Sequence, residues 1–389
     1  MNRSGEAASR HAGAQDERMA RQGTTAGARV KLEVRDLTKR FSPQVTVGPL
    51  SFQVMEGEFF SLLGPSGCGK TTTLRCIAGF ETLSAGSISL GGRRLDDRPP
   101  HRRDVGLVFQ NYALFPHLTV FDNIAFGLRL RKVDKAEIAR RIGLMLELVD
   151  LPNLGARYPA QLSGGQQQRV AIARSLVLEP SLLLFDEPLS NLDFKLRIQM
   201  RYELRDLQRR LGKTAVYVTH DQTEALALSD RIAILSEGRI EQIGTPSEIY
   251  ESPASAFVAD FIGTSNLVTA RVCGDGGDTD TAVETEHGLA LTIPRVAEGS
   301  GATLTLLLRP ERFQLAGAGD GDKIAAANRF TARVRDVTYL GEDLHLRVLA
   351  LDRQPFLVSI KNSKGTRAIA PGAAIDLAID PDDIHVLRR

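Results

Sequence analysis

The residues from Gly64 to Thr71 have the composition and spacing of a loop that binds phosphate. Their sequence, GPSGCGKT, fits the pattern G-x-x-x-x-G-K-[ST]. Glycines let the backbone turn its N–H groups toward an anion, and a helix that begins at the loop adds the positive end of its dipole. Lys70 would reach the β- and γ-phosphates of a nucleotide, and the Thr71 hydroxyl would hold Mg²⁺. The alternative is a glycine-rich turn in front of a core helix.

Two acids end an apolar run further along the chain. The run LLLFDE, Leu182 to Glu187, is predicted to be a buried strand with Asp186 and Glu187 at its tip. Asp186 can hold Mg²⁺, directly or through water. Glu187 can orient or deprotonate an attacking water. In isolation, a solvated pair of acids would be the simpler interpretation, but the position of the pair after a phosphate loop favours a catalytic role.

A second glycine-rich helix start follows the pattern LSGGQQQR, Leu162 to Arg169. Ser163 can cap a helix, while Gly164 and Gly165 expose backbone N–H groups that could bind phosphate. One nucleotide has a single γ-phosphate, which the first loop already serves. The economical arrangement is a two-fold dimer in which each chain offers this helix start to the nucleotide of the other. The alternative is an ordinary Ser-capped helix.

The elements that must position these residues form two regions with different patterns. From Val30 to about Phe261 strand-like and helix-like segments alternate, which is typical of an α/β domain with a largely parallel sheet. After about Gly263 short runs with period-two character predict a small all-β barrel or sandwich. The strands expected in the first region are VKLEVRDL, GPLSFQVM, EFFSLLG, LLLFDEP and TAVYVTH, and the helices are TTLRCIAGF and KLRIQMRYELRDLQRRL. The strands expected in the second are LVTARVC, LALTIP, ATLTLLL, FTARVRDV, LHLRVLAL, PFLVSI and AIDLAI, with GDGGDTDT and AGAGDGDK as solvated loops.

Composition excludes several classes of protein. The formal net charge of the 389 residues is +2, and residues 1 to 29 hold five Arg against three acids, so the remaining chain is neutral overall. A neutral body offers no general electrostatic footprint for nucleic acid. No apolar stretch approaches the ~18 residues of a spanning helix, and residues 1 to 29 lack the apolar segment of a signal peptide and are expected to be disordered. Three cysteines form no disulfide framework, which fits a reducing cytoplasm.

With these motifs in order, the chain resembles the ATP-binding subunits of ABC transporters over roughly residues 30 to 389. It is most similar to the importer group for polyamines, ferric iron and sugars, whose ATPases carry a C-terminal transport-associated OB domain. The resemblance implies an α/β P-loop NTPase domain at 30–263 and a small OB-like all-β regulatory domain at 264–389, after the disordered extension at 1–29. It also implies that ATP and Mg²⁺ are the cofactors.

The resemblance assigns roles to residues in seven motifs. GPSGCGKT becomes the Walker A loop, LLLFDE the Walker B strand and LSGGQ the signature, with the D-loop at Ser190 to Asp193. Gln110 matches the Q-loop glutamine, His220 matches the switch histidine, and Phe41 lies where an aromatic ring stacks on adenine. The catalytic set is Glu187, His220 and Gln110, and the metal set is Thr71, Gln110 and Asp186. The nucleotide-binding set is Phe41, Gly64, Pro65, Ser66, Gly67, Cys68, Gly69, Lys70, Thr71, Thr72, Ser163, Gly164, Gly165 and Gln166.

For single residues of these sets, a purely structural role is the alternative to the functional one. Gln110 could be a polar surface residue, His220 could be structural, and Phe41 could belong to the core. Cys68 lies in the loop at a helix N-terminus, so its thiol is expected to react readily with a maleimide. Phe194 stands after the D-loop Asp193, where relatives often have a small residue, which puts the packing across a dimer in doubt.

The apolar segment NYALFPHLTVFDNIAFGL, Asn111 to Leu128, predicts either a packed helical subdomain or a socket for a helix of a membrane-embedded partner, or both. The resemblance places the contact with the membrane subunits here. It implies a homodimer with two transmembrane permease subunits, served indirectly by an extracytoplasmic solute-binding protein. The expected location is the cytoplasmic face of the bacterial inner membrane, as a peripheral protein.

Three functional interpretations compete on the sequence alone. The favoured one is an ATPase that powers solute import, with polyamines ranked before ferric iron and sugars. The second is an ABC ATPase of DNA repair or translation, which would need very long coiled coils or two cassettes in one chain. Only 53 residues separate Gln110 from Ser163 (163 minus 110), and one cassette is present. The third is a regulatory nucleotide binder, against which the presence of Glu187 and His220 argues.

Overall fold

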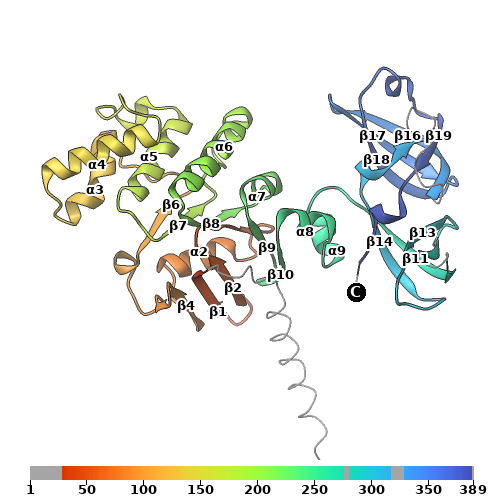
Figure 1. The fold of residues 1–389 in the computed structure, drawn as a ribbon, viewed down its shortest axis with the longest axis horizontal. Coiled ribbons are helices and arrows are strands. Elements are labelled where there is room, and N and C mark those ends of the chain that lie inside the picture. Colours follow the sequence, from red (N-terminus) through yellow and green to blue (C-terminus); the bar gives the residue numbers. More distant parts are fainter. Residues whose placement is uncertain (1–28, 276–279, 317–327, 388–389) are drawn as a thin grey trace, which may run out of the picture. The chain divides into compact units, whose positions relative to one another are not determined.

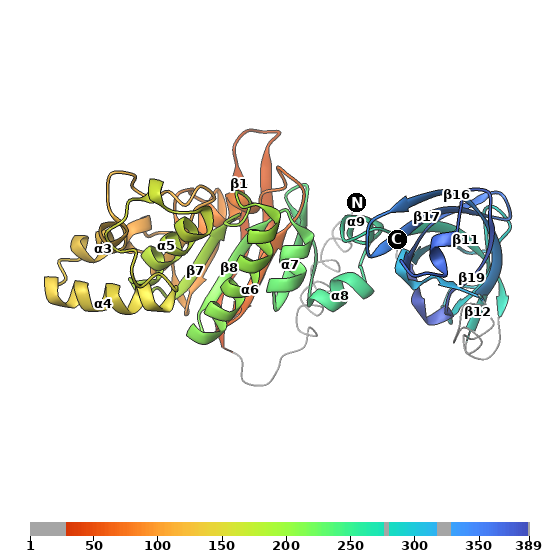
Figure 2. The ribbon, with the colours of Figure 1, turned by 90° about the horizontal axis from the view of Figure 1, so that it is seen from above.

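The computed structural model describes residues 29–275, 280–316 and 328–387. The predicted extension therefore lies outside the described residues except for its last one. Most of the predicted loop AGAGDGDK and the middle of GDGGDTDT also lie outside them. The described residues divide into two compact units, one of residues 29–60 with 69–218 and the other of residues 61–68 with the described residues from 219 onward. Figures 1 and 2 show the elements of each unit.

The first sheet is antiparallel and has the strand order β2-β1-β4-β5. Its strands are β1 (Val30–Arg40), β2 (Thr46–Met55), β4 (Ala85–Leu90) and β5 (Arg93–Arg94). The runs VKLEVRDL and GPLSFQVM are strands, as expected, but they do not belong to a parallel sheet. Only residues 41–45 connect β1 to β2, and such a short connection permits an antiparallel pair, whereas a parallel pair needs a long crossover.

The second sheet has the order β10-β9-β3-β8-β7-β6 and carries parallel pairs. Its strands are β3 (Phe59–Leu63), β6 (Val105–Val108), β7 (Leu182–Asp186), β8 (Thr214–Thr219), β9 (Arg231–Ser236) and β10 (Arg239–Gly244). Every residue of β3, β7 and β8 is buried. This is the pattern of strands covered on both faces, and it confirms the expectation from their continuous apolar runs.

The helices of the first unit are α2 (Lys70–Ala78), α3 (Val120–Leu130), α4 (Lys135–Leu148), α5 (Gly164–Leu176) and α6 (Phe194–Leu211), with the short 3₁₀ turns η1 (Pro100–Arg102) and η2 (Pro159–Gln161). Helices α3, α4 and α5 share one apolar core and form a group in Figure 1. Helix α6 packs on the sheet, where the Arg205 guanidinium lies 5.6 Å from the centre of the Phe59 ring. The amide of Gln208 also donates to the carbonyl of Gly57 at 2.8 Å.

The second unit begins with helices α7 (Gln222–Leu228), α8 (Pro246–Glu251) and α9 (Ala256–Phe261). They share a core with strand β9 that includes Ala225, Ile249, Val258 and Ile262. The three helices are short, and each begins at a side chain that caps the first turn: Asp221, Thr245 and Ser255.

From β11 onward the second unit contains two antiparallel five-stranded sheets with the orders β13-β12-β11-β14-β20 and β15-β19-β16-β17-β18. The first holds β11 (Asn266–Asp275), β12 (Asp280–Thr285), β13 (Ala290–Pro294), β14 (Thr303–Leu308) and β20 (Ile384–Leu387). The second holds β15 (Gln314–Leu315), β16 (Arg329–Tyr339), β17 (Asp343–Ala350), β18 (Gln354–Lys361) and β19 (Ala374–Ala378). The 3₁₀ turns are η3 (Pro310–Arg312), η6 (Thr366–Ala368) and η7 (Pro381–Asp383).

One apolar core lies between these two sheets, which curve around it in Figure 2. All seven strands expected here are present, so an α/β region followed by an all-β region is confirmed. The loop interpretation of GDGGDTDT is wrong at both of its ends. Strand β11 continues to Asp275, and β12 begins at Asp280 with the register Thr281 opposite Ile293.

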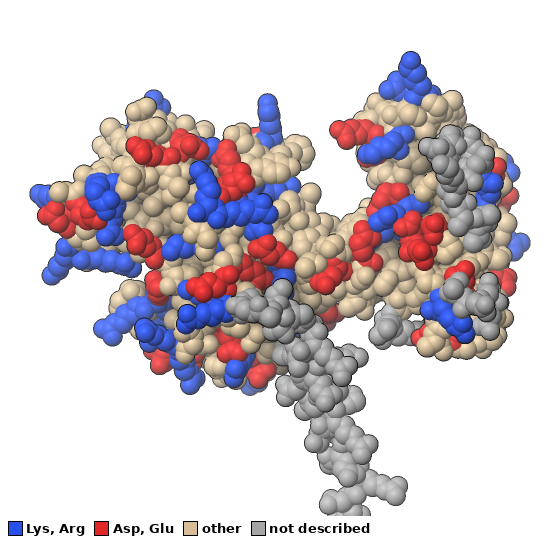
Figure 3. Space-filling view, viewed as in Figure 1, with Lys and Arg blue, Asp and Glu red and all other residues tan. Residues whose placement is uncertain are grey.

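The surface carries both signs of charge. On the face shown in Figure 3, Lys and Arg side chains are intermixed with Asp and Glu, as the balanced composition leads one to expect. Within residues 29–275, 280–316 and 328–387, no helix combines the length and the apolarity that a membrane crossing requires.

Candidate functional site

The loop from Gly64 to Thr71 connects strand β3 to helix α2, which confirms the strand–loop–helix context. Three of its glycines cannot be replaced without strain or collision. Gly67 and Gly69 have φ angles of +83° and +104°. A Cβ on Gly69 would lie 2.5 Å from a methyl carbon of Val47, and a Cβ on Gly64 would lie 2.2 Å from the carbonyl oxygen of Leu235. The backbone is therefore packed tightly against its neighbours, as a phosphate cradle requires.

The first part of the loop is exposed and its last part is buried. Pro65, Ser66 and Gly67 are exposed, whereas Cys68, Gly69 and Lys70 are buried. Lys70 is the first residue of α2 and is 5% exposed. Cys68 is 4% exposed, so the expectation that its thiol reacts readily with a maleimide is wrong. The sequence places Cys68 at a helix start but does not show that the residue is buried.

Thr71 and Asp186 come together at the end of strand β7. The Thr71 hydroxyl donates to Oδ1 of Asp186 at 3.1 Å, although 115 residues separate the two. Asp186 is 8% exposed, and burial raises the pKa of its carboxyl above the ordinary value. The hydrogen bond from Thr71 and nearby positive charges act in the opposite direction. This arrangement offers two hard oxygen ligands in a place where a cation would stabilise the carboxylate.

Glu187 follows Asp186 with an unusual backbone conformation. Its φ angle of +46° lies in the left-handed region, which costs a non-glycine residue of order 1–3 kcal/mol and is common at functional sites. Its N–H donates to the carbonyl of Val218 at 3.0 Å, which fixes this turn to strand β8. The side chain is thereby held at the end of the parallel strands, where α/β folds place their ligands.

Gln110 lies against Glu187 and the segment that follows it. Its Nε2 is 3.4 Å from Oε2 of Glu187 and 3.3 Å from the hydroxyl of Ser190. The side chain of Asn191 donates to the backbone carbonyl of Gln110 at 2.9 Å. Gln110 is exposed, and its amide has partners in Glu187 and Ser190. The contacts of Ser190 and Asn191 with Gln110 were not foreseen, because no local pattern links residues about 80 positions apart.

Ser163 is the N-cap of helix α5, as predicted. Its hydroxyl accepts from the N–H of Gln166 at 3.4 Å, and its own N–H donates to Oε1 of Gln166 at 2.9 Å. This capping box fixes the start of the helix, so that Gly164 and Gly165 lie in its first turn. A Cβ on Gly165 would lie 3.1 Å from the side chain of Leu196, so glycine allows α6 to approach closely.

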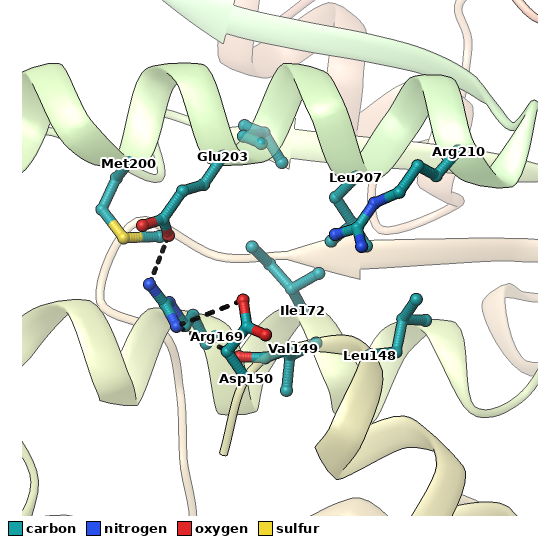
Figure 4. Close-up of a pocket in the computed structure, with 10 residues that line it drawn as sticks. Leu148, Val149, Asp150, Arg169, Ile172, Met200, Glu203, Leu207 and Arg210 are labelled. Atoms are coloured by element: carbon teal, nitrogen blue, oxygen red, sulfur yellow. Dashed lines mark hydrogen bonds and ion pairs between the residues drawn. The ribbon is translucent and has the colours of Figure 1, made fainter. Parts of the chain in front are cut away.

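A pocket lies between the end of α4, the middle of α5 and helix α6 (Figure 4). Arg169, at the end of the LSGGQQQR motif, crosses it to reach Glu203 at 2.5 Å and Asp150 at 3.9 Å. Apolar side chains such as Ile172 and Leu207 line the rest. None of the predicted site residues lines this pocket. The ion pair with Glu203 joins α5 to α6, and the ion pair with Asp150 joins α5 to the segment after α4, so both help to hold the start of α5 in place.

Phe41 and His220 occupy exposed positions. The Phe41 ring is 53% exposed, so the alternative that it belongs to the core is wrong. The ammonium of Lys39 lies 5.3 Å from the centre of the ring. An exposed aromatic ring is available for stacking on a base, worth ~1–3 kcal/mol. His220 follows strand β8 and directly precedes Asp221, the N-cap of α7.

The apolar segment Asn111 to Leu128 folds around one buried amide. Asn123 is fully buried, and its Nδ2 donates to the carbonyls of Phe115, Leu118 and Thr119 at 3.0–3.1 Å. Its Oδ1 accepts from the N–H of Phe115 at 2.8 Å. Val120, Ile124 and Leu128 belong to the core shared by α3, α4 and α5, which confirms a packed helical subdomain. Phe126 on the same helix is 40% exposed. The structural role of Asn123 was not predicted. A polar side chain within an apolar run is the feature of the sequence that could have indicated it.

Known proteins are similar to this chain in both its α/β region and its all-β region. A family model described as ABC transporter matches residues 47–190, and a TOBE domain model matches residues 306–387. The spermidine/putrescine import ATP-binding protein PotA of Acidothermus cellulolyticus is 50% identical over 345 residues, which cover 87% of this chain and 89% of that protein. The protein of the same name from Thermobifida fusca is 48% identical over 369 residues, covering 92% and 93%. Among solved structures, cbiO1 from Clostridium perfringens, part of the ABC transporter complex cbiONQ, is 29% identical. It has a TM-score of 0.53 and covers 57% of this chain and 90% of that one.

Proposed function

We propose, since this chain belongs to the ATP-binding subunits of ABC importers, that the solute whose import it powers is a polyamine of the spermidine or putrescine type. The observation that carries this proposal is the 50% identity to a spermidine/putrescine import ATP-binding protein, which extends over 87% of the chain. Because the chain is an importer ATPase, the two interpretations without transport, a soluble repair or translation ATPase and a regulatory binder, are set aside. A ferric iron or sugar importer remains the alternative that the solute experiment below tests.

We expect the nucleotide at Phe41, at the loop between β3 and α2, and at the end of β7. Adenine would stack on the exposed Phe41, and the phosphates would lie in the loop from Gly64 to Thr72, against Lys70. Thr71 and Asp186 supply hard oxygens at the place where Mg²⁺ would neutralise the β- and γ-phosphates. The fit rests on the buried Asp186 carboxyl, whose pKa burial raises above its ordinary value and which a cation would stabilise as the carboxylate.

Hydrolysis would depend on three side chains. Glu187 would accept a proton from the attacking water, and Gln110, whose amide lies 3.4 Å from it, would orient that water and reach the metal ion. His220 would contact the γ-phosphate. The support for these roles is that Gln110 and Glu187 meet although 77 residues separate them.

The functional unit would be a homodimer with two composite sites. The capped start of α5, with Ser163, Gly164, Gly165 and Gln166, would face the γ-phosphate held by the partner chain. ATP would then join the two chains, and hydrolysis would release them.

Mixing two inactive variants tests the composite site. Lys70→Ala chains and Ser163→Arg chains each form homodimers in which both sites are broken. In a mixed dimer, one composite site carries both substitutions and the other carries neither. ATP hydrolysis is therefore expected to recover in part after mixing. The steady-state rate of phosphate release is measured on each variant alone and on the mixture, with subunit exchange followed by a fluorescence label. Subunit exchange without recovery of ATP hydrolysis would contradict the proposal that each composite site is shared by two chains and works independently of the other.

The remaining assignments complete the proposal. The ATPase domain would span residues 30–263, after the extension at 1–29, and residues 264–389 would form a regulatory domain that supports the dimer. The chain would lie at the cytoplasmic face of the inner membrane on two permease subunits, fed by an extracytoplasmic solute-binding protein. The exposed Phe126 and Leu130 on helix α3 would take part in the contact with a permease helix.

The solute is tested with the assembled transporter. The chain is purified with its membrane subunits and supplied with their solute-binding protein, and ATP hydrolysis is measured with spermidine, putrescine, Fe³⁺ or maltose. Spermidine or putrescine is expected to stimulate hydrolysis, while Fe³⁺ and maltose leave the basal rate unchanged. Stimulation by Fe³⁺ or maltose alone would assign the chain to one of the other two importer groups.

A further inference from the structure

The backbone around His220 is fixed by hydrogen bonds on both sides. The Thr219 hydroxyl donates to Oε2 of Glu224 at 2.8 Å, and both residues are 2% exposed. The N–H of Asp221 donates to the same hydroxyl at 2.9 Å. The Asp221 carboxylate in turn accepts from the N–H of Glu224 at 3.1 Å. His220 therefore moves only if the start of helix α7 moves with it.

The start of α7 is tied to a distant part of the second unit by one side chain. Gln222 is the first residue of α7, and its Oε1 accepts from the N–H of Gly263 at 2.9 Å. Gly263 has a φ angle of +78°, and a Cβ there would lie 3.1 Å from Cε2 of Tyr250. Glycine is therefore required for the N–H to point at Gln222, and the position of Gly263 is set by what surrounds it.

Arg309 sets that position. It directly precedes the turn η3 in the all-β region and is 4% exposed. Its Nη1 donates to the carbonyls of Ala259, Ile262 and Thr264 at 3.0, 2.8 and 3.3 Å, and its Nη2 donates to that of Tyr250 at 3.0 Å. The guanidinium also lies 4.3 Å from the centre of the Tyr250 ring. One buried side chain thus binds the end of α8, the end of α9 and the residue after Gly263.

Apolar packing makes this link stiff. Ala225 of α7 lies in the same buried cluster as Ile249 of α8 and Val258 of α9. Further polar contacts join α8 to η3, since the Tyr250 hydroxyl donates to Glu311 and Arg312 pairs with Glu251 at 2.9 Å. A shift of η3 would therefore be transmitted to α7 instead of being absorbed by a loose segment.

We propose that Gln222 is a positioning residue for His220, and that Arg309 acts on hydrolysis through it. The link runs from Arg309 to Gly263, from Gly263 to Gln222, and from the start of α7 to His220. The inference rests on the proposed contact of His220 with the γ-phosphate. It means that Arg309 of the all-β region supports the rate of hydrolysis by holding the start of α7, while binding of ATP by the phosphate loop is unaffected.

The test compares side chains of equal length with and without the acceptor oxygen. Gln222→Met removes the acceptor and should lower the kcat of ATP hydrolysis about two- to tenfold, the effect of losing one hydrogen bond. The Kd for ATP, measured separately by equilibrium titration, should change less than twofold. Gln222→Glu keeps an oxygen that accepts from Gly263 and places an acid at a helix start, where it is tolerated, so its kcat should stay near that of the wild type.

Gln242→Met is the matched control. Gln242 also bridges backbone groups of the second unit, with Nε2 3.1 Å from the carbonyl of Ser252 and Oε1 2.7 Å from the N–H of Ala254, but none of these contacts involves α7. Its kcat should remain at the wild-type value. Arg309→Lys keeps the charge but loses the planar guanidinium whose two nitrogens donate to the carbonyls. It should lower kcat as Gln222→Met does, with an unchanged circular dichroism spectrum.

The outcomes separate this inference from the proposed function. If Gln222→Met and Gln242→Met have the same kcat while His220→Ala is inactive, Gln222 does not position the histidine and the inference is wrong. If His220→Ala hydrolyses ATP at the wild-type rate, the assignment of His220 itself fails. A rise in the Kd for ATP equal to the fall in kcat for Gln222→Met would show a general loss of structure and would also overturn the inference.

Discussion

Replacing Glu187 with glutamine is expected to lower the rate of ATP hydrolysis by about 10²–10⁴-fold while ATP still binds. Glutamine keeps the shape of the side chain and an oxygen that can accept from Nε2 of Gln110, which lies 3.4 Å from the carboxylate. It cannot take a proton from the attacking water. With ATP bound and not hydrolysed, the dimer should remain closed, so the variant should elute as a dimer in the presence of MgATP. Phosphate release and size-exclusion chromatography measure the two effects.

The chain supplies a close control for this substitution. Glu237, in the turn between β9 and β10, has a φ angle of +47°, almost the same as the +46° of Glu187. Glu237→Gln therefore makes the same chemical change at the same backbone conformation, at an exposed residue to which no catalytic role is assigned. Its rate should equal that of the wild type. Turnover of Glu187→Gln within a few-fold of Glu237→Gln would remove Glu187 from its role as general base.

Lys70→Ala is expected to weaken the binding of ATP about 10- to 150-fold. A hydrogen bond to a charged group contributes about 1.5–3 kcal/mol, and 1.36 kcal/mol corresponds to a factor of ten. Lys70 is the first residue of α2 and is 5% exposed, so its ammonium is held close to the loop. Alanine favours helix, and the substitution should leave the fold intact. Isothermal titration gives the Kd, and thermal unfolding without nucleotide checks the stability.

Lys361→Ala serves as the control for loss of a lysine charge. Lys361 lies on β18 and pairs with Asp343 on β17 at 2.8 Å, a surface pair of small energetic value. Its Kd for ATP should match the wild type. An unchanged Kd for Lys70→Ala would count against the assignment of Gly64 to Thr71 as the phosphate loop.

Sequence reasoning predicted the elements of the fold well where a continuous apolar run or a strict alternation identifies the strand. β3, β7 and β8 are fully buried and were predicted from their apolar residues alone. The antiparallel pairing of β1 with β2 was missed, because the strand pattern does not reveal which edge a strand joins. β12 was partly taken for a loop, because Asp280 and Thr281 continue a run of loop-forming residues while Thr281 is in fact buried opposite β13.

The candidate site shows a similar division between what local patterns reveal and what tertiary contacts decide. The N-cap at Ser163 is local, so the sequence predicts it. The resemblance to a family gave the roles of Gln110 and Glu187, but their contact was not predicted, because the two residues lie 77 positions apart. The burial of Cys68 and the link from Gln222 to Gly263 depend on packing between distant segments, which one sequence does not encode in any short pattern.

Transport into sealed vesicles tests the central claim most directly. The chain and its two membrane subunits are reconstituted with MgATP on the side of this chain and with radiolabelled spermidine and the solute-binding protein on the other. Wild-type vesicles are expected to accumulate spermidine only when ATP is present. Vesicles with Glu187→Gln, which still binds ATP, should accumulate no more than vesicles without ATP. Accumulation at the wild-type rate with Glu187→Gln would contradict the claim that hydrolysis at this site powers import.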